Sequence, residues 1–316
     1  MKAIGFTEFG GPEMLATLDL PEPHAGRGQV RIRVHAAAVN PSDCMTRAGA
    51  ILDHQDRMGE VPQPPYVVGW EVSGVVDEIG LDVSGDFTIG DHVIAITLPV
   101  GAGGAYVESL VVPEESVAKA PAGVGHVAAA TLPMNGLTAR LALDLLALPP
   151  GSTVAVIGAV GALGGFAVQL AKADGLTVIA DASPADAATV ALLGADTILR
   201  RCPDIADRIR EVVRDGVDGL IDCALLDDAV LPAVSDGGGI CTARFYTGPR
   251  ERGITWHPVF VGEYLRQQRK LDQLARQVES GALTLRVAGT YPAEDAAQAH
   301  HEVEKGGLRG RLVLVF

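Results

Sequence analysis

The stretch "VAVIGAVGALGGFAVQLAKADG", residues 154–175, decides which fold the rest of the chain can adopt. From Val154 to Ala171 it has no charged side chain, and glycines stand at 158, 161, 164 and 165. A run of about 20 apolar residues could cross a membrane. However, the opening "VAVI" is typical of a short buried strand, and the glycines lead into a helical pattern. We therefore expect a strand, a glycine turn and a helix, with Gln169 and Lys172 on the outer half of that helix and no membrane span.

The glycine turn has the spacing G-x-x-G-x-x-G from Gly158 to Gly164. Glycine tolerates positive φ and lets the backbone approach a pyrophosphate, and the positive end of the following helix favours an anion. The spacing departs from G-x-G-x-x-G, so a glycine-rich helix packed on a sheet would look similar, and both interpretations stay open on this motif alone. If the turn binds a pyrophosphate, the phosphate-binding residues are Gly158, Val160, Gly161, Ala162, Leu163 and Gly164.

The sequence downstream alternates between strand and helix patterns, which predicts a parallel, doubly wound sheet with its ligand at the carboxyl ends of the strands. We expect residues 122–263 to form a Rossmann dinucleotide-binding domain. The short apolar strands are expected at 176–183 ("LTVIADAS"), 197–200 ("TILR"), 217–225 ("VDGLIDCAL") and 237–245 ("GGGICTARF").

Residues 1–121 have a different pattern, in which strands are separated by Gly, Pro and Asp turns without long helical periodicity. This pattern predicts an antiparallel, barrel-like β domain. The tail, residues 264–316, contains two amphipathic helix patterns and two strand patterns, and we expect it to pack back on residues 1–121. The N-terminal strands are expected at 28–40, 67–80, 90–97 and 103–113, and the tail elements at 264–281, 285–292, 293–307 and 310–316.

Composition limits the classes of partner. The 316 residues are 48% apolar and 20% charged, with a formal net charge of −14, which argues against nucleic acid as a partner. The N-terminal "MKAIGFTEFGGPEM" has no long apolar run, so we expect a cytoplasmic protein. The four cysteines are scattered and never form C-x-x-C, which indicates neither a disulfide framework nor a clustered zinc site.

Seven motifs in order resemble the quinone oxidoreductase branch of the medium-chain dehydrogenase/reductase superfamily over nearly the whole chain. The resemblance implies an α/β protein with a GroES-like β-barrel domain (1–121 and 264–316) and a Rossmann domain (122–263), a homodimer, and nicotinamide bound between the domains. The motifs are "VNPSDCMTRAG" (39–49), "VVGWEVSGVV" (67–76), "GDHV" (90–93), "GGAYVE" (103–108), "LPMNGLTA" (132–139), "VIGAVGALGGFAVQLAK" (156–172) and "GGLRGRLVLVF" (306–316).

The relatives divide into zinc enzymes and zinc-free reductases. A catalytic zinc needs about three protein ligands from thiolate, imidazole and carboxylate. Where the zinc enzymes carry a cysteine, this chain has Asn40, and where they carry the histidine of G-H-E, it has Trp70. We therefore expect no metal, and a small-molecule quinone or α,β-unsaturated carbonyl as hydride acceptor.

By resemblance, Asn40 and Asp43 line the catalytic site, Asn40 also contacts the cofactor, and Arg47 braces the loop. The alternative for Asn-Pro-Ser-Asp is turn chemistry, with Asp43 only capping the helix that follows. Some relatives carry a tyrosine where this chain has Met45. The proton donor therefore stays open between solvent and the tyrosines Tyr66, Tyr106 and Tyr246.

The choice of dinucleotide depends on the end of the second Rossmann strand. An acidic residue there usually binds the ribose of NAD, but Asp181 falls one residue before the expected position, which holds Ala182. Arg200 and Arg201 could instead meet a 2′-phosphate. We expect NADPH, with NADH as the alternative. Further cofactor contacts are expected at Ser183, Thr138, Cys223, Ala224, Arg244 and Arg311.

Three functions are consistent with the sequence. The first is an NADPH-dependent, zinc-free reductase of quinones or enones. The second is a dedicated enoyl reductase of a biosynthetic pathway, acting on an enoyl thioester or enone intermediate. The third, from another class, is a non-catalytic dinucleotide-binding redox sensor.

Overall fold

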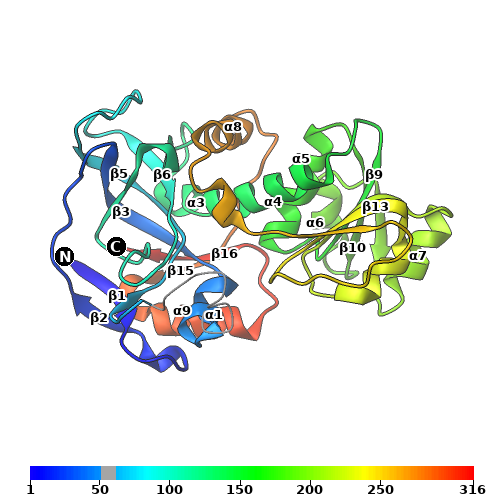
Figure 1. Ribbon diagram of the computed structural model, residues 1–316, viewed down its shortest axis with the longest axis horizontal. Helices are drawn as coiled ribbons and strands as arrows, with labels where there is room; N and C mark the ends of the chain where they lie inside the picture. The colour runs from blue at the N-terminus through cyan, green and yellow to red at the C-terminus, as the bar shows by residue number, and fades with distance from the viewer. Residues whose placement is uncertain (51–61) are drawn as a thin grey trace. The chain divides into compact units, whose positions relative to one another are not determined.

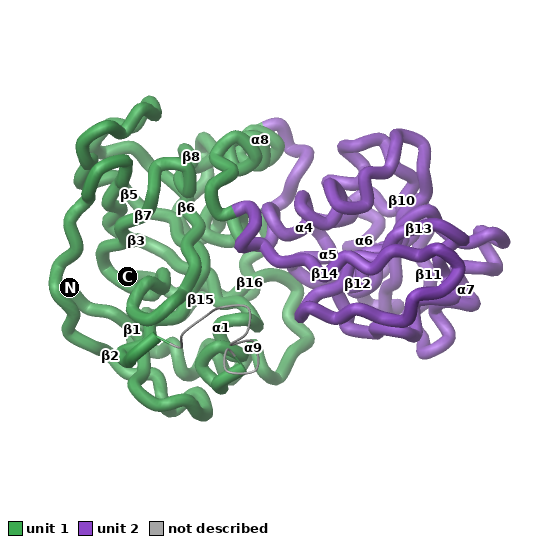
Figure 2. Tube along the Cα trace, viewed as in Figure 1, with its two compact units in different colours: residues 1–134, 265–279, 285–316 green, residues 135–264, 280–284 purple. Residues whose placement is uncertain are grey.

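A computed structural model describes residues 1–50 and 62–316, which form two compact units (Figure 2). Unit 1 comprises residues 1–134, 265–279 and 285–316, and unit 2 comprises residues 135–264 and 280–284. Residues 122–134 thus belong to the β-rich unit 1, and residues 280–284 belong to unit 2.

Unit 2 is built on a sheet whose described strands are all parallel, in the order β11-β10-β9-β12-β13-β14 (Figure 1). This order confirms the expected Rossmann-type parallel sheet. The strands are β9 (Thr153–Ile157), β10 (Thr177–Ala182), β11 (Thr197–Arg200), β12 (Val217–Asp222), β13 (Val234–Thr242) and β14 (Thr255–Pro258). The helices are α4 (Pro133–Leu146), which begins in unit 1, α5 (Ala162–Ala173), α6 (Ala187–Leu192) and α7 (Ile205–Val212), with short 3₁₀ turns η4 (Asp227–Ala233) and η5 (Val261–Tyr264).

The opening stretch folds as a strand, a turn and a helix. Residues 154–157 of β9 are buried, because the strand lies inside the sheet, between β10 and β12. The expectation for Gln169 is wrong. This side chain is buried, and both ends of its amide are hydrogen-bonded: Nε2 donates to the Gly165 carbonyl (3.0 Å), and Oε1 accepts the Thr284 N–H (2.9 Å). Within residues 1–50 and 62–316, no helix is both long and apolar enough to span a bilayer.

Unit 1 is mainly antiparallel, as expected, and its larger described sheet has the order β15-β16-β3-β5-β6-β8, with β7 also paired to β3. A smaller sheet has the order β2-β1-β4. The strands are β1 (Lys2–Phe6), β2 (Ala16–Asp19), β3 (Gln29–Val39), β4 (Tyr66–Val67), β5 (Glu71–Ile79), β6 (His92–Ile96), β7 (Ser109–Pro113), β8 (Val117–Lys119), β15 (Val287–Pro292) and β16 (Arg311–Val315).

The tail strands and helices belong to unit 1. Strand β16 pairs with β3 through Leu312↔Val39 to Val315↔Ala36, so the last strand of the chain completes the larger sheet. The helices of this unit are α1 (Pro41–Arg47), α3 (His126–Ala129), α8 (Gln268–Glu279) and α9 (Ala296–Lys305), with 3₁₀ turns η1 (Pro12–Met14), η3 (Glu114–Ser116) and η6 (Ala293–Asp295).

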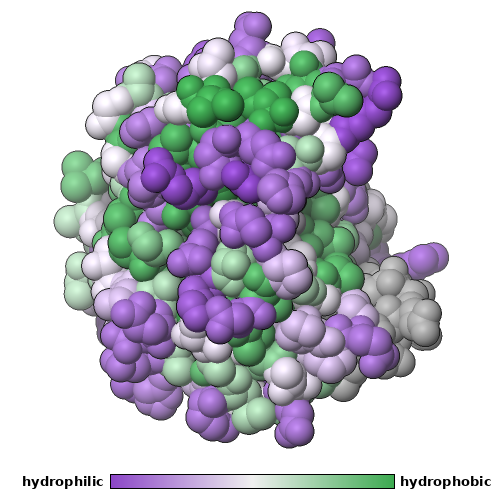
Figure 3. Space-filling view, turned by 90° about the vertical axis from the view of Figure 1, so that its left-hand side faces the viewer, coloured by the Kyte–Doolittle hydropathy of each residue, from purple (hydrophilic) through white to green (hydrophobic). Residues whose placement is uncertain are grey.

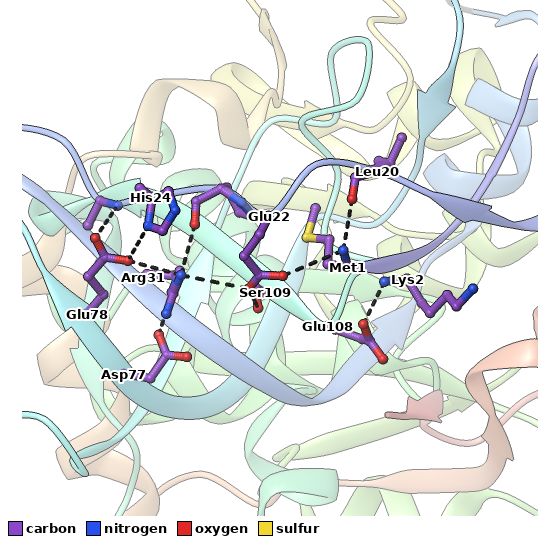
Figure 4. Close-up of polar contacts among 12 residues, drawn as sticks. Met1, Lys2, Leu20, Glu22, His24, Arg31, Asp77, Glu78, Glu108 and Ser109 are labelled. Atoms are coloured by element: carbon purple, nitrogen blue, oxygen red, sulfur yellow. Dashed lines mark hydrogen bonds and ion pairs between the residues drawn. The ribbon is translucent and has the colours of Figure 1, made fainter.

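Polar contacts link the N-terminal residues of unit 1 to one another and to neighbouring strands of the same unit (Figure 4). The Met1 ammonium donates to the Leu20 carbonyl (2.8 Å). On β3, Arg31 donates from Nε to Asp77 (2.8 Å), and its Nη1 lies 3.0 Å from Glu78.

The face of the molecule in Figure 3 mixes hydrophilic and hydrophobic side chains, as a water-exposed surface usually does.

Candidate functional site

The glycine turn lies between β9 and α5. Gly158 has φ +79°, and a Cβ there would lie 3.1 Å from the Cys223 carbonyl carbon. At Gly164 a Cβ would collide with the Gly158 carbonyl and lie 2.8 Å from the Ala159 Cα. Gly161 is the N-cap of α5. The glycines therefore allow the start of a twelve-residue helix to pack directly on the turn, as a phosphate cradle requires.

Asp181 turns its side chain toward this glycine turn. The side chain is 2% exposed. Its Oδ1 accepts the Gly158 N–H (2.6 Å) and the Ala159 N–H (3.3 Å), and its Oδ2 accepts Arg201 Nε (2.5 Å). The carboxylate is thus occupied by the turn and by Arg201.

The other predicted residues at this end of β10 and β11 lie close by in the strand register. Ala182 pairs with Arg200, and the Arg201 N–H donates to the Ala182 carbonyl (2.8 Å). Ser183 donates its hydroxyl to the buried carboxylate of Asp186 (2.7 Å). Both arginines are exposed, so the sheet edge presents positive charge next to the glycine turn.

The carboxyl ends of β12 and β13 contribute a second part of the site. Asp222 accepts the Ala224 N–H (2.9 Å), and the Cys223 N–H donates to the Ile157 carbonyl (2.9 Å), which holds the predicted residues Cys223 and Ala224 against the turn. Leu225 and Arg244 have φ of +59° and +57°, a conformation that non-glycine residues rarely adopt. A cavity of about 500 Å³ is lined by Leu225, Asp227, Ala243, Arg244, Phe245, Tyr246 and Thr247.

Backbone strain of this kind clusters at ligand sites. The parallel sheet of unit 2 also predicts a ligand at the carboxyl ends of its strands. The structure therefore gathers the glycine turn and the predicted residues after β10, β11, β12 and β13 at that edge of one sheet. Thr138, also predicted to contact the cofactor, is half-buried on α4 of the same unit.

In unit 1, Asp43 is a buried centre of hydrogen bonding. Its Oδ2 accepts the Asn40 N–H (2.8 Å) and the Tyr106 hydroxyl (3.2 Å), and its Oδ1 accepts the Gly69 N–H (3.1 Å). Burial raises the pKa of Asp43 to about 7, and these donors act in the opposite direction. The contact with the Asn40 N–H is one half of a capping box at the start of α1, which supports the capping interpretation of Asp43.

Asn40 is fully buried, and its amide is held by Glu71, a residue that the sequence analysis did not single out. Asn40 Nδ2 donates to Glu71 Oε1 (2.9 Å), and Glu71 Oε2 accepts the Met134 N–H (2.7 Å) near the start of α4. Burial raises the pKa of Glu71 to about 7. The signal available in the sequence was a carboxylate inside the apolar run "VVGWEVSGVV".

Two arginines accompany these carboxyl groups. Arg47, expected to brace the loop, is buried at the end of α1 and pairs with Glu304 of α9. Arg311, predicted to contact the cofactor, begins β16. Burial lowers its pKa, and the charges of Glu71 and Asp43 oppose that effect.

The three candidate tyrosines all have acceptors. Tyr66 donates to the Pro62 carbonyl (2.9 Å), and Tyr246 donates to Asp228 (2.5 Å). Tyr106 is fully buried between Asp43 and His300, and burial raises its pKa well above the usual value. Each of the three hydroxyls is therefore engaged in a hydrogen bond in the described structure.

Asn40 and Trp70 stand where the resemblance places zinc ligands. Asn40 supplies an amide that is engaged with Glu71, and Trp70 supplies an indole. Neither group replaces a thiolate or an imidazole as a zinc ligand. Among the residues that the structure describes, no group of three metal-ligating side chains comes together.

Comparison with known proteins gives the family. Residues 26–122 match the alcohol dehydrogenase GroES-like domain, and residues 193–314 match the zinc-binding dehydrogenase domain. The chain is 31% identical to a 2-haloacrylate reductase of Burkholderia sp, over 97% of this chain and 96% of that protein. It belongs to the quinone oxidoreductase branch of the medium-chain dehydrogenase/reductase superfamily.

Other members of the superfamily are nearly as similar. An NAD-dependent alcohol dehydrogenase of Sulfolobus acidocaldarius is 29% identical over 99% of both chains. The solved structure of the quinone oxidoreductase from Coxiella burnetii superimposes with a TM-score of 0.83 at 28% identity, covering 100% of this chain and 99% of that one. The relatives are oxidoreductases, and this dehydrogenase family binds a nicotinamide dinucleotide.

Proposed function

We propose that the chain catalyses NADPH-dependent, zinc-free transfer of a hydride to a quinone or to the β-carbon of an α,β-unsaturated carbonyl. The observation that carries this proposal is the pair Asn40 and Trp70 at the family's zinc-ligand positions, with the Asn40 amide bound to Glu71. Without a Lewis acid to polarise an alcohol, an acceptor that is already electron-poor is the favoured substrate. The names of two relatives, a 2-haloacrylate reductase and a quinone oxidoreductase, indicate acceptors of that kind.

The residues of unit 2 fit a dinucleotide. In the proposal, the backbone from Gly158 to Gly164 and the start of α5 hold the pyrophosphate, and Arg200 and Arg201 supply positive charge at the adenosine end. The residues after β12 and β13, including Cys223, Ala224 and Arg244, form the rest of the binding edge. The bound nicotinamide dinucleotide supplies the hydride, and the chain binds and orients it.

The residues of unit 1 hold the proposed catalytic loop. Asp43 ties the loop to Gly69, Glu71 fixes the orientation of the Asn40 amide, and Arg47 fixes the end of α1. Asn40 lines the acceptor site in this proposal. We assign the final proton to solvent, because the hydroxyls of Tyr66, Tyr106 and Tyr246 are each bound to an acceptor.

Stopped-flow oxidation of NADPH and NADH in the presence of 1,4-benzoquinone, an enone, a trans-2-enoyl thioester or no acceptor tests the proposal. We expect rapid oxidation of NADPH with benzoquinone or the enone, unchanged by a zinc chelator. Rapid turnover of the thioester alone would instead indicate the dedicated enoyl reductase. Tight binding of NADPH without oxidation by any acceptor would indicate the redox sensor, and loss of activity with the chelator would contradict the zinc-free mechanism.

A further inference from the structure

Asp181 has the residue type that usually selects NAD, but its side chain is bound to the glycine turn and to Arg201. A carboxylate at the end of the second strand normally accepts the ribose hydroxyls and repels a 2′-phosphate. Here the side chain is 2% exposed, and both oxygens are occupied, one by the N–H groups of Gly158 and Ala159 and the other by Arg201. The carboxylate presents little surface to a ribose.

Arg201, in contrast, is held at one end and exposed at the other. Its backbone N–H is bound to the Ala182 carbonyl (2.8 Å) and its Nε to Asp181 (2.5 Å), while the side chain is 46% exposed. Among the described residues, no other polar contact of its guanidinium is found. A guanidinium fixed through Nε keeps its two outer nitrogens available for a bidentate contact with a phosphate.

We propose that Asp181 is a positioning residue that favours NADPH, because it fixes Arg201 at the edge of the glycine turn where the 2′-phosphate binds. The carboxylate thus has the opposite effect on cofactor choice from the usual acidic residue at the end of this strand. It also links the two phosphate sites, since the same side chain binds the N–H groups of the turn. This inference rests on the proposed use of a nicotinamide dinucleotide.

The test compares binding of 2′,5′-ADP and of 5′-ADP, which differ by the 2′-phosphate, by isothermal titration calorimetry. Loss of a charged hydrogen bond to a phosphate weakens binding roughly 10-fold or more. We expect Arg201→Gln and Asp181→Asn each to lower the ratio of 2′,5′-ADP affinity to 5′-ADP affinity by that factor. Asp181→Asn also weakens both ligands, because it loosens the turn. Arg214→Gln, at an exposed arginine that precedes β12 and so lies at the opposite end of the strands, is the matched control and should change the ratio by less than about 3-fold.

Two further variants separate positioning from a merely structural role. If Asp181 acts through Arg201, the double variant Asp181→Asn/Arg201→Gln has the same affinity ratio as Arg201→Gln alone. Arg201→Lys should restore part of the ratio, since it keeps the charge. A ratio that rises in Asp181→Asn would overturn the inference, because it would mean that the carboxylate repels the 2′-phosphate. An unchanged ratio in Arg201→Gln would overturn it as well.

The binding assay contains no hydride acceptor, so its result is independent of the reaction. If the chain discriminates the two nucleotides as described but reduces no quinone or enone, the proposed reaction fails and the role of Asp181 stands. If it reduces quinones while Asp181→Asn leaves the affinity ratio unchanged, the reaction stands and the role of Asp181 fails.

Discussion

Glu71 is a carboxyl group within an apolar strand. Its Oε1 accepts a hydrogen bond from Asn40 Nδ2, and its Oε2 accepts one from the Met134 N–H. Burial raises its pKa to about 7, above the usual value of 4.5. The folded chain therefore retains a proton on Glu71 that the unfolded chain releases between these two values. The stabilisation linked to this proton is fully present below pH 4.5 and is lost as the pH rises through about 7.

In Glu71→Gln, one of the two accepting oxygens becomes an NH₂ group. This group cannot accept a hydrogen bond and would face a donor, either Asn40 Nδ2 or the Met134 N–H. We expect a loss of about 1–3 kcal/mol in the free energy of unfolding, measured by urea denaturation. The advantage of the wild type over the variant should shrink as the pH rises from 4.5 to 7. Glu115→Gln, at an exposed glutamate, is the control and should cost less than about 0.5 kcal/mol. A constant difference across this pH range would contradict the raised pKa.

Gly161→Asp tests the phosphate cradle at one residue. Gly161 has an ordinary φ of −64°, and Asp is a favourable N-cap, so the variant should fold. Its carboxylate would face the bound pyrophosphate, and we expect NADPH affinity to fall by roughly 100-fold in a fluorescence titration. Gly161→Asn has nearly the same size without the charge and should retain much more affinity. Equal affinities for the wild type and the Asp variant would refute the placement of the phosphates.

At the scale of elements, strands β3 and β6 and helix α3 bring three histidines into one stack. The His126 ring lies between the rings of His35 and His92, with both centroid distances 4.6 Å and interplanar angles of 9° and 23°. His126 Nδ1 lies 2.8 Å from the Ser73 hydroxyl of β5. Burial, together with the neighbouring His35 and His92, lowers the pKa of His126 to about 4.

The histidine stack predicts a loss of stability in acid. The unfolded chain binds a proton at His126 near pH 6.5, and the folded chain binds it only near pH 4, so the stabilisation is present above pH 6.5 and is lost as the pH falls toward 4. His126→Phe keeps a stacked ring but removes the titration, and Ser73 still donates to the Val93 carbonyl (3.0 Å).

We expect the free energy of unfolding of His126→Phe to fall less steeply than that of the wild type between pH 6.5 and 4, in urea titrations at each pH. At pH 7 the two proteins should differ by less than about 1.5 kcal/mol. Parallel curves would mean that His126 titrates normally in the folded chain.

At the scale of the whole molecule, the homodimer implied by the family remains a prediction. In the described part of the chain, the sheet of unit 2 ends at β14, and no described strand pairs with its outer edge. An open edge of this kind is a common site for pairing between subunits. Light scattering during size-exclusion chromatography should give twice the chain mass of 32.8 kDa, and a monomer mass at micromolar concentration would refute the dimer.

The sequence predicted the arrangement of elements better than the contacts of individual side chains. The turn at Gly158 and the antiparallel strands around β3 were predictable, because glycine conformation and strand patterns are local properties. The histidine stack was not, since His35, His92 and His126 meet only through the pairing of β3, β5 and β6. Likewise, the pattern around Asp181 predicts a strand, but its partner Arg201 follows from the register of β10 and β11.

The pairing of β16 with β3 has a consequence for biosynthesis. A nascent chain emerges from the ribosome with its N-terminus first, and domains generally fold as they emerge. The stretch 135–264 can therefore assemble most of unit 2 while the partner strand of β3 is still being translated. The β-rich unit, although it starts first, is completed last, and until then the edge of β3 that β16 covers is open to chaperones or to another nascent chain.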